Sequence, residues 1–303
     1  MTPIILTIYN RPEHTKRTLE ALKANTLAKD SILYIYADGY KEEEDKEEVL
    51  NTREVVKDVK GFKEVHVVER DKNIGLANSI IGSVTEVINK HGKVILLEDD
   101  LVTSPVFLEY MNNMLDRYEK EKKVFSITGF GYPDNLMKIP SDYNYDVYFV
   151  PRAGSWGWAT WKDRWNKADW VIEDFEEFKK DKKMRKEFNK GGDDMSDMLI
   201  RQMEGKIDSW AIRWCYTLFK NNAYCIYPIK SYVDNIGMDG SGVHCTEIES
   251  FENTYLNQGV NIKTPPEINI NELILKNFRS VFQRNLINDT VSYIKKKYKQ
   301  LLK

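Results

Sequence analysis

The chain has 303 residues and is close to neutral, with 45 lysines and arginines against 47 aspartates and glutamates. A chain of this length can bury a substantial core as one large domain or two modest ones. Its balanced charge supplies no basic arm of the kind that follows nucleic-acid phosphates, so nucleic acid is not an expected partner.

The first hundred residues alternate the patterns of strands and helices. Apolar runs that end in Asn, Asp or Gly predict strands, and amphipathic or charged stretches predict the helices between them. Strands are expected at residues 3–10, 31–39, 64–75 and 93–98, and helices at residues 13–25, at the end of 40–59, and at 76–92. This alternation indicates βαβ units and a mostly parallel sheet flanked by helices.

The pattern becomes less regular beyond residue 120, where aromatic and charged stretches replace the alternation. One helix is expected to open at an N-cap acid, Asp208. In chain order the sequence predicts a strand at 123–131, an irregular aromatic stretch at 133–165, charged helices at 173–203 interrupted at Gly191–Gly192, a helix at 208–222, a short strand followed by a Gly-rich loop up to His244, and a basic helix from Lys276.

Three consecutive acids follow the fourth predicted strand, in the sequence "KVILLEDD". The run Val94 to Leu97 has no polar alternation and therefore predicts a strand buried on both faces. Acids at the carboxyl end of such a strand lie where α/β sheets bind their ligands. The groups expected at this edge are Asn10 and Arg11 after the first strand, Asp38 after the second, Arg70, Lys72 and Asn73 after the third, and Glu98, Asp99 and Asp100 after the fourth.

These side chains suit a nucleotide diphosphate. Carboxylates accept hydrogen bonds from a base or a ribose, and Arg11, Arg70 or Lys72 could complement phosphate charge. Oxygen ligands such as Asp100 suit Mg²⁺ or Mn²⁺, which could bridge the diphosphate. The alternative is that these residues have only structural roles and bind no ligand. A pair of acids can cap a helix or lie in a solvated turn, and Asp38-Gly39 can be a plain turn.

The same residues resemble a known family. "ILTIYNRPEHTKRTLEAL" and "RDKNIGLANSI" are similar to the opening strand and third-strand turn of bacterial family-2 sugar transferases of the GT-A fold. "EDDLVTSPVFLEYMNNML", "IDSWAIRW" and "YPIKSYVDNIGMDGSGVH" resemble segments of the N-acetylglucosaminyltransferase I type. The resemblance covers roughly residues 3 to 245 and is sharpest at 97–110 and 208–244.

The resemblance implies roles for the acids. Asp100 would hold the metal, Glu98 and Asp99 would face the nucleoside, ribose or donor sugar, and Asp38 would lie near the base or ribose. Such enzymes usually invert the anomeric carbon, which requires a general base, and a carboxylate suits that task. Asp208 is the first candidate for this base. The N-acetylglucosaminyltransferase I type has two acids before its Trp, whereas Ser209 stands second here, so Asp194 and Asp197 are the alternative candidates.

Two other motifs could complete the site. His244 follows Gly237, Gly240 and Gly242, and an imidazole on such a loop can bind Mn²⁺ or a diphosphate, although a lone histidine is more often structural. Among the clustered tryptophans, Trp161 and Trp165 are expected in the core. Trp156 and Trp158, which small residues flank, are the candidates for stacking on a donor or acceptor sugar.

We expect a GT-A, Rossmann-like α/β fold with a C-terminal helical extension. The transferase domain would span residues 1–265, with a nucleotide-binding half at 1–120 and an acceptor half at 121–265. The extension would span residues 266–303. The expected function is that of an inverting, metal-dependent glycosyltransferase that uses Mn²⁺ or Mg²⁺. Its donor would be a nucleotide sugar, a UDP-sugar by the resemblance, and its acceptor a saccharide or a lipid-linked saccharide. The expected setting is surface polysaccharide or glycoconjugate synthesis. The alternatives are an inactive carbohydrate-binding domain of this type and a sugar-phosphate nucleotidyltransferase, although the latter calls for a Gly-rich loop that "IYNRPEHT" lacks.

The sequence also bears on where the protein works. Cys215, Cys225 and Cys245 have no metal-finger spacing, which indicates reduced thiols. The N-terminal residues lack a signal-peptide pattern, and no apolar stretch approaches the ~20 residues of a spanning helix. We therefore expect a cytoplasmic protein. The basic C-terminal helix could rest on anionic lipid at the inner face of the membrane, and packing on the domain or on a second subunit is the alternative.

Overall fold

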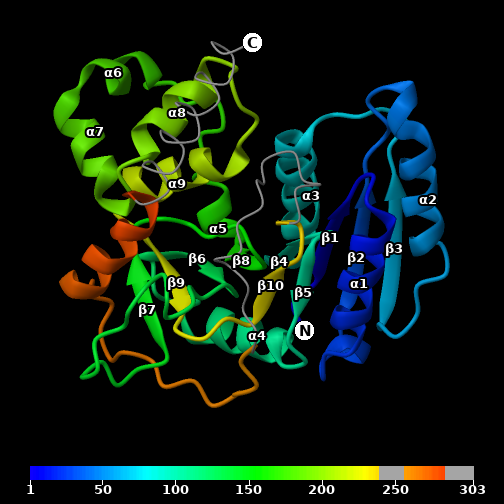
Figure 1. Cartoon of the computed structure of the whole chain (residues 1–303), viewed down its shortest axis with the longest axis horizontal. Coiled ribbons are helices and arrows are strands. Elements are labelled where there is room, and N and C mark those ends of the chain that lie inside the picture. The colour runs from blue at the N-terminus through cyan, green and yellow to red at the C-terminus, as the bar shows by residue number, and fades with distance from the viewer. Residues whose placement is uncertain (239–255, 284–303) are drawn as a thin grey trace, which may run out of the picture.

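The computed structural model describes residues 1–238 and 256–283 (Figure 1). His244, Cys245 and the basic residues beyond position 283 lie outside these ranges. Within them, an eight-stranded sheet and a two-stranded ribbon form. The strands are β1 (Ile4–Ile8), β2 (Ile32–Ala37), β3 (Glu64–Glu69), β4 (Lys93–Glu98), β5 (Leu101–Thr103), β6 (Val124–Thr128), β7 (Val147–Val150), β8 (Trp158–Trp161), β9 (Tyr224–Pro228) and β10 (Val233–Asn235).

The large sheet has the order β3-β2-β1-β4-β8-β6-β9-β7. Its first four strands are parallel, with Thr7 of β1 opposite Glu98 of β4. β8 runs antiparallel to β4 and β6, and β7 runs antiparallel to β9. The predicted α/β class, a mostly parallel sheet flanked by helices, is confirmed.

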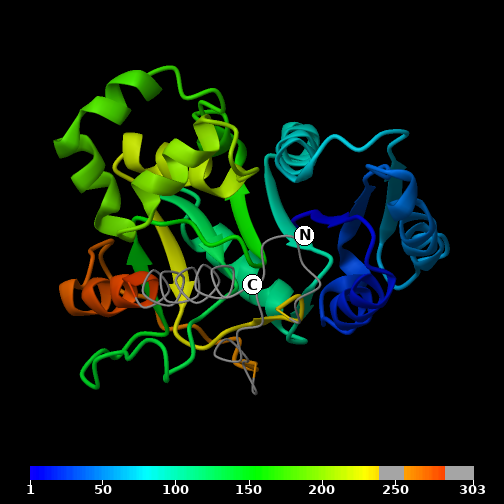
Figure 2. The ribbon, with the colours of Figure 1, turned by 45° about the horizontal axis from the view of Figure 1, so that its top comes forward.

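Helices cover both faces of this sheet. They are α1 (Pro12–Lys23), α2 (Lys46–Val56), α3 (Leu76–His91), α4 (Phe107–Arg117), α5 (Lys162–Trp165), α6 (Phe175–Lys180), α7 (Lys182–Phe188), α8 (Met195–Met203), α9 (Trp210–Lys220) and a further helix at residues 272–283. The blue α1 and the sea-green α4 lie on one side of the sheet, and α3 with the green helices lies on the other (Figure 2).

β4 shows how one strand serves both layers. Val94 and Leu96 belong to the core beneath α3 and α9, and Ile95 and Leu97 belong to the core beneath α1 and α4. All four side chains are fully buried. Because successive side chains of a strand point to opposite faces, an unbroken apolar run is what a strand between two helical layers requires.

The stretch at 133–165 is more regular than the sequence suggested. It contains β7, β8 and the short helix α5. β8 fills the place between β4 and β6, and its four residues, including Trp158 and Trp161, are all buried. The glycines before β8 hid this strand from pattern recognition, because large aromatic residues next to glycine are typical of loops as well.

The helix at residues 272–283 packs against the α3 and α9 side of the core. Ile274, Leu275, Phe278 and Val281 are buried there. The ring of Phe278 lies 5.3 Å from that of Tyr227 on β9. The described part of the basic C-terminal helix is therefore bound to the domain by its apolar side.

Candidate active site at the carboxyl edge of the sheet

The strand order reverses between β1 and β4. The chain proceeds from β1 outward to β2 and β3 and then returns to place β4 on the other side of β1. In open α/β sheets, the crevice at the carboxyl ends of two such strands is where ligands bind. Arg11 follows β1 and Asp100 follows β4, so the topology places both at this point.

Three acids stand at the end of β4. Glu98 is the last residue of the strand, on the face of Leu96, and Asp99 and Asp100 follow in a turn. Asp99 Oδ2 accepts a hydrogen bond from the backbone N–H of Tyr9 at 3.1 Å, and the hydroxyl of Thr18 donates to the Asp99 carbonyl oxygen at 2.8 Å. Asp99 thereby joins the end of β4 to the end of β1 and to α1.

Burial dominates the electrostatics of this cluster. It raises the pKa of both Glu98 and Asp99 above the usual carboxyl range, and the neighbouring Asp100 carboxylate raises each further. Burial also raises the pKa of Asp100, although Arg11 opposes that shift. Burial therefore favours the neutral forms of these clustered acids, and the positive charge of Arg11 opposes that effect.

Asp100 forms an ion pair with Arg11. Nη1 of Arg11 lies 2.9 Å from Oδ2 of Asp100, and the two side chains are only 14% and 17% exposed. The segment after β10 covers the pair, because β10 pairs with β5 and the backbone N–H of Ile236 donates to the Asp100 carbonyl at 2.9 Å. A Cβ atom on Gly237 would overlap the Asp100 carboxylate and lie 2.9 Å from Nη1 of Arg11.

We expect the substitution Gly237→Ala to disturb ligand binding without unfolding the protein. The added methyl group must push the Asp100 carboxylate aside, which should weaken metal-dependent nucleotide binding roughly ten-fold, about 1.4 kcal/mol. Isothermal titration calorimetry with UDP and Mn²⁺ measures this effect. Gly259→Ala is the control, because it lies on an exposed segment and a Cβ atom there would meet only the side-chain oxygen of Asn257, at 3.2 Å. Equal affinities for Gly237→Ala and the wild type would contradict the expected overlap.

The ends of β2 and β3 form the other part of the edge. Asp38 is 5% exposed and its carboxylate accepts from the backbone N–H of Ile74 at 3.2 Å and of Gly39 at 3.2 Å. Asn73 donates to the Gly39 carbonyl at 2.9 Å. These bonds hold residues 73–75 against the end of β2, and burial raises the pKa of the Asp38 carboxyl.

The basic residues of this part differ in their surroundings. Nη1 of Arg70 lies 3.9 Å from Oδ1 of Asp38 and also donates to the hydroxyl of Ser79 on α3. Lys72 is exposed, and Asn10 is partly buried beside Arg11. The structure therefore brings Asn10, Arg11, Asp99 and Asp100 to one end of the edge, and Asp38, Arg70 and Asn73 to the other.

The three candidate bases occupy different environments. Asp208 is exposed, and its Oδ2 accepts from the backbone N–H of Ala77 at 3.3 Å, in the first turn of α3. Asp194 is held by Arg152 through two contacts of 2.7 and 2.9 Å. Asp197 is exposed on the first turn of α8. Asp208 is thereby bonded to α3, an element of the β1–β4 half.

The predicted N-cap at Asp208 is wrong. Ser209 caps α9, since its hydroxyl accepts from the backbone N–H of Ile212 at 3.4 Å. Asp208 precedes the cap and reaches across to α3, whose own N-cap residue, Gly75, has no side chain to offer. The acid therefore bridges α9 and α3.

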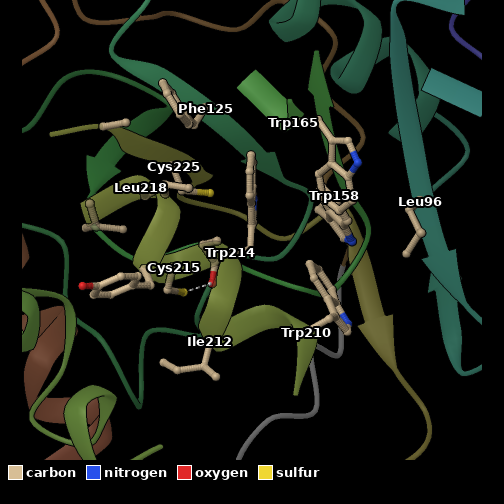
Figure 3. Packing of buried hydrophobic residues seen from close by; sticks show 14 of the residues in the cluster. Leu96, Phe125, Trp158, Trp165, Trp210, Ile212, Trp214, Cys215, Leu218 and Cys225 are labelled. Carbon is tan, nitrogen blue, oxygen red and sulfur yellow. Dashed lines mark hydrogen bonds between the residues drawn. The ribbon is translucent and has the colours of Figure 1, made fainter. Parts of the chain in front are cut away.

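The tryptophans divide differently from their predicted roles. Trp161 and Trp165 are core residues, as expected, with 3% and 2% exposure. Trp158 is fully buried and stacks on Trp210 with 4.8 Å between ring centroids (Figure 3). Its ring therefore packs in the core and has no face open to a sugar. Trp156 is partly buried, packs edge-on against Phe130 at 4.4 Å, and is the one of the two with an accessible side.

Tyr9 is a site residue that the sequence did not single out. Its backbone N–H binds Asp99, and its hydroxyl donates to Asp45 at 2.7 Å and accepts from the backbone N–H of Lys41 at 3.1 Å. It therefore links the loops after β1 and β2. The one hint in the sequence was its position, directly before Asn10 and Arg11.

The comparisons with known proteins are sparse. No family model matches the chain, and no curated protein matches it in sequence. A UDP-glucose pyrophosphorylase complexed with UDP-glucose is 11% identical, with a TM-score of 0.33 over 55% of this chain and 79% of its own. Glucosyl-3-phosphoglycerate synthase from Mycobacterium tuberculosis, in complex with Mn²⁺, UDP and glucosyl-3-phosphoglycerate, is 10% identical, with a TM-score of 0.31 over 54% of this chain and 58% of its own. At these scores the likeness assigns no function to this chain.

In residues 1–238 and 256–283, no three His, Cys, Asp or Glu side chains converge closely enough to hold a metal ion by themselves. Within the same ranges, no helix has both the length and the apolar character needed to cross a bilayer.

Proposed function

We propose that the protein is a glycosyltransferase that moves a sugar, with inversion, from a nucleotide-diphosphate donor to an acceptor hydroxyl. The observation that carries the proposal is the cluster of Glu98, Asp99 and Asp100 with Arg11 at the β1–β4 reversal. Buried like charges are costly to a fold, and they are typical of sites that bind a cation or a polar ligand. Surface polysaccharide or glycoconjugate synthesis is the setting that the sequence resemblance suggests.

The residues of this edge fit a divalent cation. Their donors are carboxyl oxygens, which Mg²⁺ and Mn²⁺ prefer, and a bound cation would favour the ionised form of these acids, whose pKa burial raises. Such ions are usually held by one or two carboxylates together with substrate phosphates and water, so Asp100 can serve as the protein's contribution. When bound there, the ion would supply charge stabilisation for the departing diphosphate.

The protein's own side chains provide the rest of the chemistry. Asp38 and Asn73, fixed between β2 and β3, present polar groups to the nucleoside, and Arg70 lies beside them. Asp208 accepts the proton of the acceptor hydroxyl while that oxygen bonds to the anomeric carbon. The bond from the anomeric carbon to the diphosphate breaks in the same step, and the diphosphate leaves with the electron pair.

Nucleotide binding with and without Mn²⁺ tests this proposal. A ligand at about one hundred times its dissociation constant stabilises the folded state by about 2.7 kcal/mol, roughly 5 °C in melting temperature for a chain of this size. We expect one of UDP-glucose, UDP-N-acetylglucosamine, UDP-galactose or GDP-mannose to give such a rise with Mn²⁺ and a smaller one with EDTA.

The outcome also separates the rival functions. Release of free nucleoside diphosphate in the presence of saccharide acceptors indicates transfer. Formation of nucleoside triphosphate from a nucleotide sugar and pyrophosphate would instead indicate a nucleotidyltransferase. A melting temperature that rises with oligosaccharides but with none of the nucleotides would indicate a carbohydrate-binding domain. That result would overturn the proposal.

A further inference from the structure

We propose that Arg213 and Trp170 form a subsite for an anionic acceptor, in which the guanidinium binds a carboxylate or phosphate and the indole ring packs on the sugar. The inference rests on the proposed function and names the class of acceptor that this function would use. It gives two residues of the acceptor half a role in specificity, beside the proposed base, Asp208.

Arg213 is a partly buried cation on α9. Its Nη1 donates to the backbone carbonyl of Trp170 at 3.0 Å, and its Nε is buried without a hydrogen-bond acceptor. Within the described residues, the acid that acts on this guanidinium is Asp208, through space rather than through an ion-pair contact. Burial lowers the pKa of Arg213, and the Asp208 carboxylate opposes that shift.

The burial of this guanidinium is only partly compensated. A guanidinium stays protonated in proteins, so it cannot escape the cost of burial by losing its proton. Asp208 compensates in part, because its Oδ2 accepts from the backbone N–H of Ala77 and is held on α3. An anionic oxygen brought by a ligand would give Arg213 the direct partner that the protein does not supply.

Trp170 brings the tryptophan cluster to the surface next to this cation. Its ring lies 4.6 Å from the buried ring of Trp165 and 5.9 Å from the guanidinium carbon of Arg213. Trp170 itself is partly buried, and the following residue, Val171, is 68% exposed. A flat apolar ring beside a guanidinium suits a ligand that combines a sugar ring with a negative charge.

The proposed base lies at an open part of the surface. Asp208 is exposed, and a Cβ atom on Gly75 would lie 3.2 Å from its Oδ2 oxygen. The residues on either side of this glycine, Ile74 and Leu76, are 41% and 38% exposed. A saccharide can therefore approach the Asp208 carboxylate from solvent beside the start of α3.

Asp208 and Arg213 offer an acceptor two different contacts near the start of α9. Asp208 is bonded to α3, whereas Arg213 is bonded to the segment between α5 and α6. A hydroxyl of the acceptor would meet the base, and a carboxylate or phosphate elsewhere on it would meet the guanidinium, whose planar fork suits both groups. Arg213 also offsets the repulsion that Asp208 would exert on such an anion.

Saturation-transfer NMR with matched sugars tests the inference. The probes are methyl β-D-glucuronide, glucose 6-phosphate and the neutral methyl β-D-glucoside, each titrated into protein with UDP and Mn²⁺. We expect at least one charged probe to bind roughly ten- to 100-fold more tightly than the neutral one, because hydrogen bonds to charged groups are strong. The charged probe that binds more tightly shows whether the subsite takes a carboxylate or a phosphate.

Variants locate this preference. Arg213→Met should bind the charged probes no better than the glucoside and should keep its affinity for UDP with Mn²⁺. Arg213→Lys should keep part of the preference, since an ammonium retains the charge without the planar fork. Trp170→Leu should weaken charged and neutral probes alike. The control is Arg201→Met, an exposed position on α8, which should leave every affinity unchanged.

Two outcomes would overturn the subsite. One is wild-type protein that binds the charged and neutral probes equally, or none of them. The other is a folded Arg213→Met protein that keeps the preference, or that loses nucleotide affinity as much as probe affinity. If Arg213→Met does not fold, Arg213→Lys decides, with an expected loss of about three-fold in the preference; an unchanged preference would count against the subsite.

The result separates this inference from the function on which it rests. Wild-type protein that binds neither UDP nor GDP in the presence of Mn²⁺ would overturn the transferase and the acceptor role together. Wild-type protein that binds a nucleotide with Mn²⁺ but does not distinguish charged from neutral sugars would retain the transferase and reject the anionic acceptor alone.

Discussion

Asp100→Asn is expected to lower kcat/KM for sugar transfer by about three orders of magnitude, close to 4 kcal/mol of transition-state stabilisation. The amide keeps the size of the carboxylate and an oxygen that can accept from Arg11. It loses the negative charge that a divalent ion requires, so the loss should fall on metal-dependent steps. Release of nucleoside diphosphate, measured at several Mn²⁺ concentrations, gives the rate.

The fold should survive this substitution. Burial disfavours the charged form of Asp100, so a neutral side chain removes a repulsion with Glu98 and Asp99. Asp116→Asn is the matched control, since Asp116 also pairs with a basic side chain but lies on α4, away from the site. Full activity of a folded Asp100→Asn protein would refute the assignment of this carboxylate to the metal.

Asp208→Asn is expected to reduce kcat about 10²- to 10⁴-fold and to leave the affinity for the donor nucleotide unchanged. Asparagine retains an oxygen that can accept from the backbone N–H of Ala77, so the bridge from Asp208 to α3 is kept. It cannot accept the proton of the acceptor hydroxyl. Steady-state kinetics with donor and acceptor varied separately would show this pattern.

Two companion variants distinguish a base from a helix-capping acid. Asp208→Ala removes both the base and the bond to α3, and should lower the free energy of unfolding by about 1 kcal/mol in addition. Asp197→Asn changes the neighbouring exposed acid of α8 and should have normal kinetics. A large loss of kcat in Asp197→Asn with normal Asp208→Asn kinetics would transfer the role to Asp197.

The parallel half of the sheet was predictable because each of its elements has a local pattern. β4 follows from four adjacent apolar residues, and α1 from Leu19 and Leu22 on one side of a charged helix. Once these elements are known, the rules of βαβ connection place the ends of β1 and β4 side by side. The position of Arg11 and Asp100 at one edge therefore follows from sequence.

The other half depends on contacts that no local pattern records. β8 is inserted antiparallel between β4 and β6, and only the tertiary packing of Trp158 shows why an aromatic stretch forms a strand there. Likewise, the sequence allows either Asp208 or Ser209 to cap α9. The choice depends on the backbone N–H of Ala77, which is 131 positions away along the chain.

The stacked tryptophans have a consequence for how this protein can be observed. Trp158, Trp165, Trp170, Trp210 and Trp214 form a connected series of ring contacts, in which each ring centroid lies within 6.4 Å of at least one other. Trp210 is two positions from Asp208, and Trp158 is paired with Leu96, two positions before Glu98. Five of the chain's seven tryptophans therefore form one connected cluster whose members lie close in the chain or in strand register to Asp208 and Glu98, which gives the molecule an intrinsic optical reporter of this region.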